Sequence, residues 1–287
     1  MTMRGDLRLS TEFRPITVET NLISCKDGSS CVIYGKTKVI SSILGPKQSK
    51  KLKFERFNHL SIDVDVDLAY KNSIDNSTSS TLSTAASTAN ITQGSSNNNN
   101  SLMKKKYSKF IKDSIFPCID IYKFPLMLLS IHVLIINDDG SSLPIAVNAS
   151  ILALLDAGIP MLCYIQSISI VLLSLYKDNN DHNVDSNNDD DNEHQLIVDP
   201  CSEEERQCKA MFTFSIVCND NYNNSNNKDK NNEIATRILL NESTGRFDHQ
   251  VLIDAVKLAI DSIQTLSKLI REAIISNLKL SQSLSSS

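Results

Sequence analysis

The sequence contains no tryptophan among its 287 residues, and only 6% of its residues are aromatic. Because the bases of single-stranded RNA stack on exposed aromatic rings, such platforms must be few in this protein. The formal net charge of −4 excludes a strongly basic nucleic-acid-binding protein but leaves room for a local basic patch. Hydrophobic residues make up 41% of the chain, which is enough to form a sizeable core.

Metal-binding and targeting motifs are also lacking. The seven cysteines include no C-x-x-C pair and the five histidines are scattered, so we expect reduced thiols, no metal site and no cofactor. The start "MTMRGDLRLSTEFRP" has no apolar segment, so we expect no secretory signal and no membrane partner. The uncharged stretch 159–176 is about as long as a membrane span, but its alternating, β-branched pattern favours a pair of buried strands.

The run Gly35-Lys36-Thr37 follows an apolar strand and invites comparison with a phosphate-binding loop. Ser30 occupies the position where that motif requires its first glycine. The following residues "KVISSIL" are typical of a strand, whereas a phosphate loop continues into a helix. The sequence therefore predicts a hairpin turn here.

Three polar segments do not belong to any core, namely residues 72–101, 177–194 and 219–233. They hold almost no large apolar residue, so burial cannot offset the entropy of ordering them. We expect flexible low-complexity insertions in a single domain that spans residues 1–287.

The remaining sequence predicts strands followed by helices in both halves of the chain. Strands are expected within 21–46, with turns at Lys26-Asp27-Gly28 and Gly35-Lys36-Thr37, and further along at 62–68, 124–138 and 210–217. Helices are expected over 102–116, over 141–158 with a serine cap at Ser141 or Ser142, and over about 28 residues after Asp248. This order favours an α+β fold with helices over a mixed sheet.

Two stretches resemble RNase PH-like proteins. "RPITVETNLISCKDGSSCVIYGKTKVISSILGP" is similar to the opening of that family, with its Arg-Pro-Ile start and its Asp-Gly-Ser and Gly-x-Thr-x-Val turns. "INDDGSSLPIAVNASILALLDAGIPM" is similar to the second signature, a strand that ends in Asp-Gly and a helix that ends in Asp-Ala-Gly-Ile-Pro. The resemblance implies an RNase PH-like fold of the ribosomal protein S5 domain 2-like class.

Within the family, "VDPCSEEERQCKAMFTFSI" is similar to a stretch of eukaryotic RNA exosome ring subunits, closest to the exosome component five type. That resemblance implies a hetero-oligomer of about nine subunits, with other RNase PH-like subunits in the ring and S1/KH cap proteins upon it. It also implies RNA in the ring channel and a location in the nucleus, nucleolus and cytoplasm.

Active members of the family cleave RNA by phosphorolysis, and an Arg in their Asp-Gly-Gly-Thr-Arg run holds the phosphate at a helix N-terminus. The matching run here ends in Leu143, which offers no donor. No Asp stands between Asp199 and Asp220, and the simpler interpretation of Glu203–Glu205 is a solvated charge run. We therefore expect no catalytic residues and no enzyme activity. The alternative is a phosphate-dependent 3′-to-5′ exoribonuclease.

Lysines on one predicted helix match family arginines that face the ring channel, so they are candidates for RNA contact. An exposed helix face with solubilising lysines is the competing interpretation. A second basic run could act in the same way, and a free-standing binding module also stays open. The candidates are Lys104, Lys105, Lys106 and Lys109, and the second run comprises Lys47, Lys50, Lys51, Lys53 and Arg56.

Overall fold

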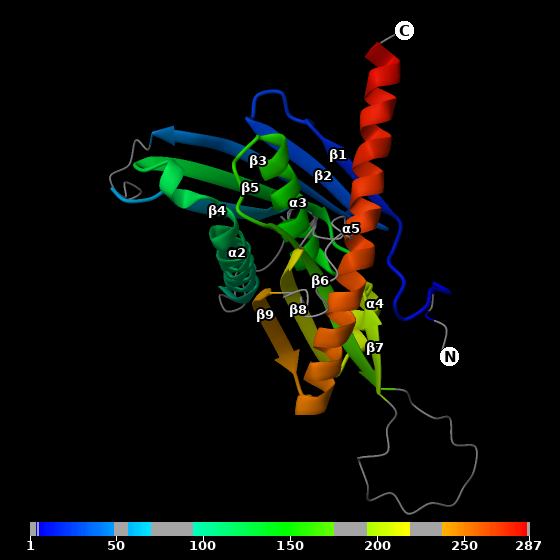
Figure 1. Cartoon of the computed structure of the whole chain (residues 1–287). Coiled ribbons are helices and arrows are strands. Elements are labelled where there is room, and N and C mark those ends of the chain that lie inside the picture. Colours follow the sequence, from blue (N-terminus) through cyan, green and yellow to red (C-terminus); the bar gives the residue numbers. More distant parts are fainter. Residues whose placement is uncertain are drawn as a thin grey trace, which may run out of the picture.

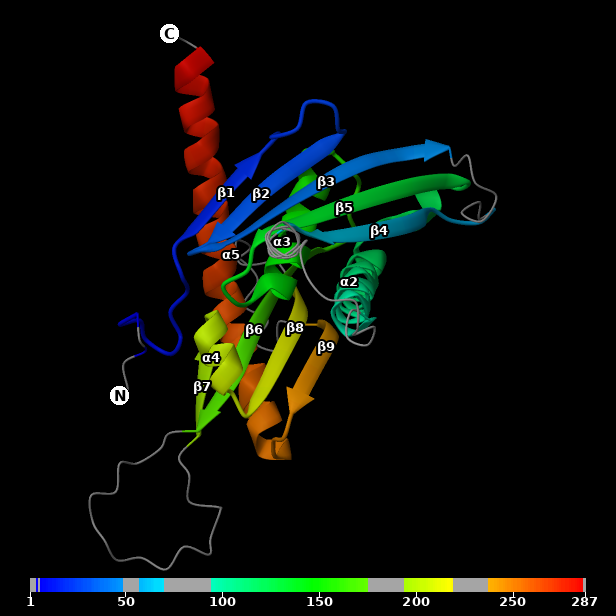
Figure 2. The same ribbon diagram turned by 180° about the vertical axis from the view of Figure 1, so that it is seen from behind.

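The computed structural model of the chain describes residues 4, 6–48, 57–69, 94–174, 194–218 and 237–285. Two β-sheets lie one above the other, with helix α3 (Ser142–Asp156) between them and helix α5 (His249–Ser285) running along both (Figure 1). Helix α2 (Gly94–Ile115) lies on the opposite side of the molecule from α5, as the view from behind also shows (Figure 2). The short helix α4 (Ser202–Gln207) lies next to the second sheet.

The first sheet has five strands in the order β1-β2-β3-β5-β4. β4 runs parallel to β5 and all other pairs are antiparallel, so the sheet is mixed, as expected. β4 confirms the strand predicted over residues 62–68, and from Ile62 on its residues alternate between buried and exposed, so one face of the strand is exposed. The strands are β1 (Ile16–Thr20), β2 (Gly28–Tyr34), β3 (Thr37–Gln48), β4 (Ser61–Leu68) and β5 (Met127–Asn137).

The second sheet has four antiparallel strands in the order β7-β6-β8-β9. The uncharged stretch from residue 159 supplies one long strand of this sheet, where we had expected two. None of the helices among the described residues is long and apolar enough to cross a membrane. The strands are β6 (Tyr164–Ser174), β7 (His194–Val198), β8 (Ala210–Cys218) and β9 (Ile238–Gly245).

Helix α3 is buried along nearly its whole length because small residues let the strands approach it closely. Ala146, Ala149 and Ala153 form the small-residue face of the helix and are fully buried. At the other side of the contact, a Cβ atom on Gly28 would lie 2.5 Å from the backbone oxygen of Ala153. Gly28 therefore sets the distance between β2 and α3.

Helix α5 joins the cores of the two sheets. Ala255, Ala259 and Ile263 pack in the cluster of the second sheet, whereas Leu266 and Ile270 pack in the cluster that surrounds α3. The helix has 37 residues, longer than we expected. No glycine or proline follows His249, so nothing in the sequence ends the helix at the last core residue.

One of the two predicted tight turns is confirmed. Gly35, with a φ of +56°, and Lys36 connect β2 to β3, so this motif is a hairpin turn. The prediction of a tight turn at Lys26-Asp27-Gly28 is wrong, because β1 already ends at Thr20 and Gly28 opens β2. The Asp27 carboxylate instead accepts a hydrogen bond of 2.7 Å from the backbone N–H of Gly45.

Helix α2 begins at Gly94, inside the segment 72–101 that we assigned to the first insertion. Adding residues to an existing helix is easier than starting one, so the polar run 94–101 can continue it. Likewise, His194 opens β7 and does not belong to the second insertion. Most of the three predicted insertions lies outside the described residues.

Candidate functional site

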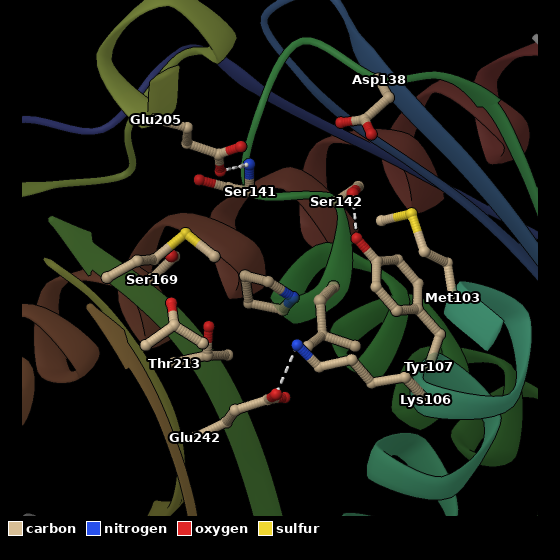
Figure 3. A pocket seen from close by; sticks show the side chains of 14 residues that line it. Met103, Lys106, Tyr107, Asp138, Ser141, Ser142, Ser169, Glu205, Thr213 and Glu242 are labelled. Atoms are coloured by element: carbon tan, nitrogen blue, oxygen red, sulfur yellow. Dashed lines mark hydrogen bonds and ion pairs between the residues drawn. The ribbon is translucent and has the colours of Figure 1, made fainter. Parts of the chain in front are cut away.

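A cavity of about 200 Å³ lies where the junction of β5 and α3 meets α2 and the second sheet (Figure 3). It is lined by the run that ends in Leu143, where the family resemblance implies a phosphate-binding arginine in active members. Its polar lining comes from four parts of the chain: Lys106 and Tyr107 of α2, Asp138, Ser141 and Ser142 at the junction, Glu205 of α4, and Ser169, Thr213, Glu242 and Thr244 of the second sheet.

A carboxylate of the protein itself occupies the amino end of α3. The backbone N–H of Ser141 donates a hydrogen bond of 2.6 Å to Glu205 Oε1. Burial raises the pKa of Glu205 to about 7, and Asp138 and Asp199 also raise it, although Ser141 and Arg14 oppose them. A phosphate would need this helix end for its own negative charge, so Glu205 competes with a phosphate at this position.

The first turn of α3 offers no cationic donor. Leu143 is only 6% exposed and lines the cavity with an apolar side chain. Pro144 lies in this first turn, where a proline costs no helical hydrogen bond. Ser141 occupies the N-cap position, as predicted, but its side chain makes no capping hydrogen bond. Its φ is +56° and its hydroxyl donates to the backbone oxygen of Pro200, while Ser142 Oγ shares a hydrogen bond of 3.1 Å with the Tyr107 hydroxyl.

The ammonium group that lines the cavity is already paired. Lys106 Nζ lies 2.6 Å from Glu242 Oε1, so α2 and β9 are joined across the cavity by an ion pair. Asp138 and Glu205 add two further carboxylates to the lining. Burial raises the pKa of Tyr107 to about 12, and Asp138, Glu205 and Glu242 add to this increase. The lining is therefore predominantly acidic.

A buried ion pair holds the junction behind the cavity in place. Arg14 Nη2 lies 2.7 Å from Asp199 Oδ1, and both side chains are almost fully buried. The same guanidinium donates to the backbone oxygens of Asp139, at 2.8 Å, and Gly140, at 3.2 Å. Asp199 therefore has a structural role.

The interpretation of Glu203–Glu205 as a solvated charge run holds only for Glu203, which is exposed. Glu204 accepts a hydrogen bond of 2.6 Å from Arg4 Nε, and Glu205 faces the cavity. The sequence pattern missed both roles because their partners lie far away along the chain.

The four lysines proposed for RNA contact all lie on α2 but differ in their surroundings. Lys104 Nζ lies 2.8 Å from Asp67 Oδ1, and Lys106 is the residue paired with Glu242. Lys105 and Lys109 are exposed, and neither forms an ion pair with another described residue. In the second basic run, Lys47 Nζ lies 3.2 Å from Asp27 Oδ2, and the other members lie outside the described residues.

The part of the chain that the structure describes contains no group of three or more His, Cys, Asp or Glu residues that could hold a metal ion. A larger cavity of about 640 Å³ lies on the other side of the junction, among Arg8, Lys36 and Glu203. It is more open and mixes both signs of charge, so its chemistry is less defined than that of the smaller cavity.

Comparison with known sequences defines the family. The family model "3′ exoribonuclease family, domain 1" of RNase PH matches residues 12–160, which is more than half of the chain. The chain therefore belongs to the RNase PH family of 3′ exoribonucleases. This range contains β1 to β5, α2 and α3, and so includes the junction at the cavity.

Curated relatives carry exosome names. The exosome complex component RRP41-like of Arabidopsis thaliana is 27% identical over 203 residues, which cover 70% of this chain and 62% of the relative. The exosome complex component Rrp41 of Archaeoglobus fulgidus is 24% identical over 273 residues, or 95% of this chain and 86% of the relative. The exosome complex exonuclease RRP46 homolog of A. thaliana is 28% identical, over 55% of this chain and 54% of the relative. The matches thus span less than two thirds of both plant relatives.

Solved structures confirm the RNase PH-like α+β fold. Rice (Oryza sativa) Rrp46 has a TM-score of 0.63 at 19% identity, with 93% of this chain and 98% of that chain covered. A chain of an archaeal exosome core has a TM-score of 0.59 at 17% identity, covering 93% of this chain and 91% of that chain. A chain of an Archaeoglobus fulgidus exosome with RNA bound to the active site also reaches 0.59, at 17% identity and with 93% and 92% covered.

Proposed function

We propose that this chain is a non-catalytic structural subunit of an RNA exosome core ring. In that role it supports 3′-to-5′ RNA processing and degradation, including rRNA maturation and RNA surveillance, by channelling RNA to associated nucleases. The proposal is supported by the exosome names of its relatives and by its fold, which it shares with exosome core chains. The observation that carries the non-catalytic part is Glu205 at the amino end of α3.

Phosphorolysis needs an anchor for the attacking phosphate. An active site of this kind uses cations or N–H groups aimed at that anion in a desolvated place. Here the Leu143 side chain offers no donor, the Ser141 N–H is bonded to Glu205, and Lys106 is bonded to Glu242. A phosphate that entered the cavity would have to displace a carboxylate, and would then face the charges of Asp138 and Glu242. The geometry therefore supports a binding or structural role over catalysis.

The ring position and partners are part of the proposal. We place the chain beside other RNase PH-like subunits, with S1/KH cap proteins above the ring and about nine subunits in all. The component five type stays our proposal for its position, although the relatives reported above carry RRP41 and RRP46 names. We expect the complex in the nucleus, nucleolus and cytoplasm, as for an RNA-processing assembly.

Native mass spectrometry on the tagged chain, purified from its own cells, tests the assembly. A complex of about nine different subunits would support the ring proposal and identify the neighbours. A lone monomer or a homo-oligomer would contradict it. Subunit identities would also decide between the component five position and an RRP41-type or RRP46-type position.

RNA contact by α2 is the second part of the proposal. Lys104, Lys105, Lys106 and Lys109 would supply salt-dependent phosphate contacts without sequence selectivity. Reversing the charge of Lys104–Lys106 in the assembled complex should weaken RNA crosslinking to this subunit. The ion pairs of Lys104 and Lys106 predict that Lys105→Glu alone causes most of the loss. Unchanged crosslinking would favour a solubilising role.

A phosphorolytic 3′-to-5′ exoribonuclease is the alternative function, favoured by the family itself and by the exonuclease name of one relative. The purified complex should be incubated with labelled RNA and inorganic phosphate, and the release of nucleoside diphosphates measured. Asp138→Asn with Glu205→Gln in this subunit provides the matched comparison. If phosphate-dependent release occurs and is lost in this double variant, the subunit is catalytic and our proposal is wrong.

A further inference from the structure

The exposed aromatic residues of the described part of the chain lie on segments that meet in one place. Phe57, Phe116 and Tyr122 are 81%, 40% and 74% exposed. Phe116 follows α2 directly, and its ring meets that of His59 edge to face, with 6.5 Å between the centroids. The backbone N–H of Leu60 donates to Ile121 at 2.9 Å, which brings the segment of Phe57 next to that of Tyr122. The segments that carry the three rings therefore meet near the carboxyl end of α2.

A row of lysines leads along α2 to these rings. Lys105, Lys109 and Lys112 are all exposed and follow one another at intervals of four and three residues. With 3.6 residues per turn, this spacing places them on one side of the helix, and Phe116 continues the same row. At 1.5 Å per residue, the row from Lys105 to Phe116 extends over about 16 Å.

The charge of this row is largely uncompensated. Among the described residues, no carboxylate forms an ion pair with any of the three lysines. Asp113 is exposed and adjoins the row on the flank next to Lys112. Lys104 and Lys106, by contrast, are turned toward Asp67 and Glu242 on the flanks of the helix. The row therefore keeps most of its positive charge for an outside ligand.

Exposed aromatic rings at the end of a lysine row match the chemistry of single-stranded nucleic acid. Lysines contact the phosphates, while every base has a face that can stack on an aromatic ring. A protein partner with a purely apolar surface would match the rings but would not need three lysines in line. A duplex would match the lysines but not the rings, because its bases are stacked on one another.

We propose that Lys105, Lys109 and Lys112 bind the backbone of single-stranded RNA and that Phe116, Tyr122 and Phe57 stack its bases. This surface runs along the outer side of α2, whereas the cavity contacts α2 through Lys106 and Tyr107. The choice of RNA as the ligand rests on the proposed function. The assignment of Lys112 and the aromatic rings rests on the structure alone.

The test is fluorescence anisotropy of the full chain with a labelled oligouridine, measured at several salt concentrations. A variant with Lys105, Lys109 and Lys112 all changed to Gln should bind about tenfold more weakly at 0.1 M salt. Its plot of log affinity against log salt should be shallower by about 2, because each lost phosphate contact removes about 0.7. Tyr122→Ala should weaken binding at least fivefold with the same salt slope as wild type, and Tyr122→Phe should restore it.

The matched control changes three exposed lysines of another helix, Lys257, Lys268 and Lys279 of α5, to Gln. This control loses the same charge, so it should bind RNA as wild type does. All of these side chains are exposed, and such changes leave stability nearly unaltered. A duplex of the same length should be insensitive to Tyr122→Ala.

The proposal is overturned if the wild-type chain does not bind the oligouridine, or if the α2 triple variant and the α5 control behave alike. It is also overturned if Tyr122→Ala leaves RNA affinity unchanged but releases a subunit from the complex, which would identify a protein contact. Ring membership and phosphorolysis are measured without these variants, so these outcomes are separate from the ring-subunit and non-catalytic parts of the proposed function.

Discussion

Replacing Glu205 with glutamine should change how the stability of the protein depends on pH. Glutamine keeps an oxygen that can accept the Ser141 N–H but carries no charge at any pH. In the wild type, burial raises the pKa of Glu205 to about 7, from the ordinary value of 4.5. The folded state therefore holds a proton that the unfolded state releases between these two values.

The sign and size follow from proton linkage. A carboxyl group whose pKa is raised by folding does not lower the free energy of unfolding below pH 4.5. Its destabilising effect grows as the pH rises from 4.5 to about 7. At about 1.4 kcal/mol per pH unit, this cost reaches about 3 kcal/mol above pH 7. That figure is an upper limit, because part of the side chain reaches solvent.

The free energy of unfolding of both proteins should be measured by urea titration from pH 5 to pH 8. Relative to wild type, Glu205→Gln should gain up to about 3 kcal/mol across this range. Asp138, Asp199 and Arg14, whose charges act on Glu205, are present in both proteins, so their own titration largely cancels. Glu203→Gln, on the exposed side of the same helix, is the control and should run parallel to wild type.

Parallel curves for Glu205→Gln and wild type would refute the reasoning. They would show that Glu205 is ionised in the folded state at all these pH values. Ready ionisation of Glu205 would imply that water reaches the side chain more easily than described above and that the neighbouring carboxylates repel it less.

Three further changes test the packing and the chemistry of the site. Arg14→Lys should lower the free energy of unfolding by about 3 kcal/mol, seen as a lower melting temperature, because one ammonium nitrogen cannot replace the three guanidinium nitrogens that contact Asp199 and two backbone oxygens. An unchanged melting temperature would contradict this role. Gly28→Ala should lower the free energy of unfolding by about 3 kcal/mol, because its Cβ would clash with α3. Gly158 has a φ of +65° and open space around it, so Gly158→Ala should lower it by only about 1 kcal/mol. Equal losses in the two variants would contradict this reasoning. Leu143→Arg should give the purified complex no new release of nucleoside diphosphates from RNA, because Glu205 still occupies the helix end; a gain of activity would count against the non-catalytic proposal.

Much of the fold could be predicted from the sequence because its signals are local. The alternation in β4, the small residues of α3 and the apolar stripe of α5 each depend on residues within a few turns or strand positions. The predictions were wrong at the ends of some helices and strands, where the residue pattern is ambiguous. Asp27-Gly28 reads as a tight turn, yet the chain continues as a longer loop before β2.

The site was harder to predict because its contacts join distant parts of the chain. Glu205 lies 64 positions from Ser141, and Asp199 lies 185 positions from Arg14. A run of three glutamates looks the same in the sequence whether it faces water or a cavity. Only the packing of α4 against the junction separates exposed Glu203 from Glu205 at the helix end.

The strand pairing in the second sheet determines where the protein can tolerate insertions. Ser174 and His194 are partners in the ladder of β6 and β7, and the N–H of Val217 donates to Arg237 at 2.9 Å. The chain leaves and re-enters the sheet at neighbouring positions, so the segments between need only connect two adjacent points. Each doubling of such a connection costs only about 0.6 kcal/mol, so repeat expansion or an inserted affinity tag at either point should leave the sheet folded. Insertions in the coding sequence should therefore be tolerated well at these two points.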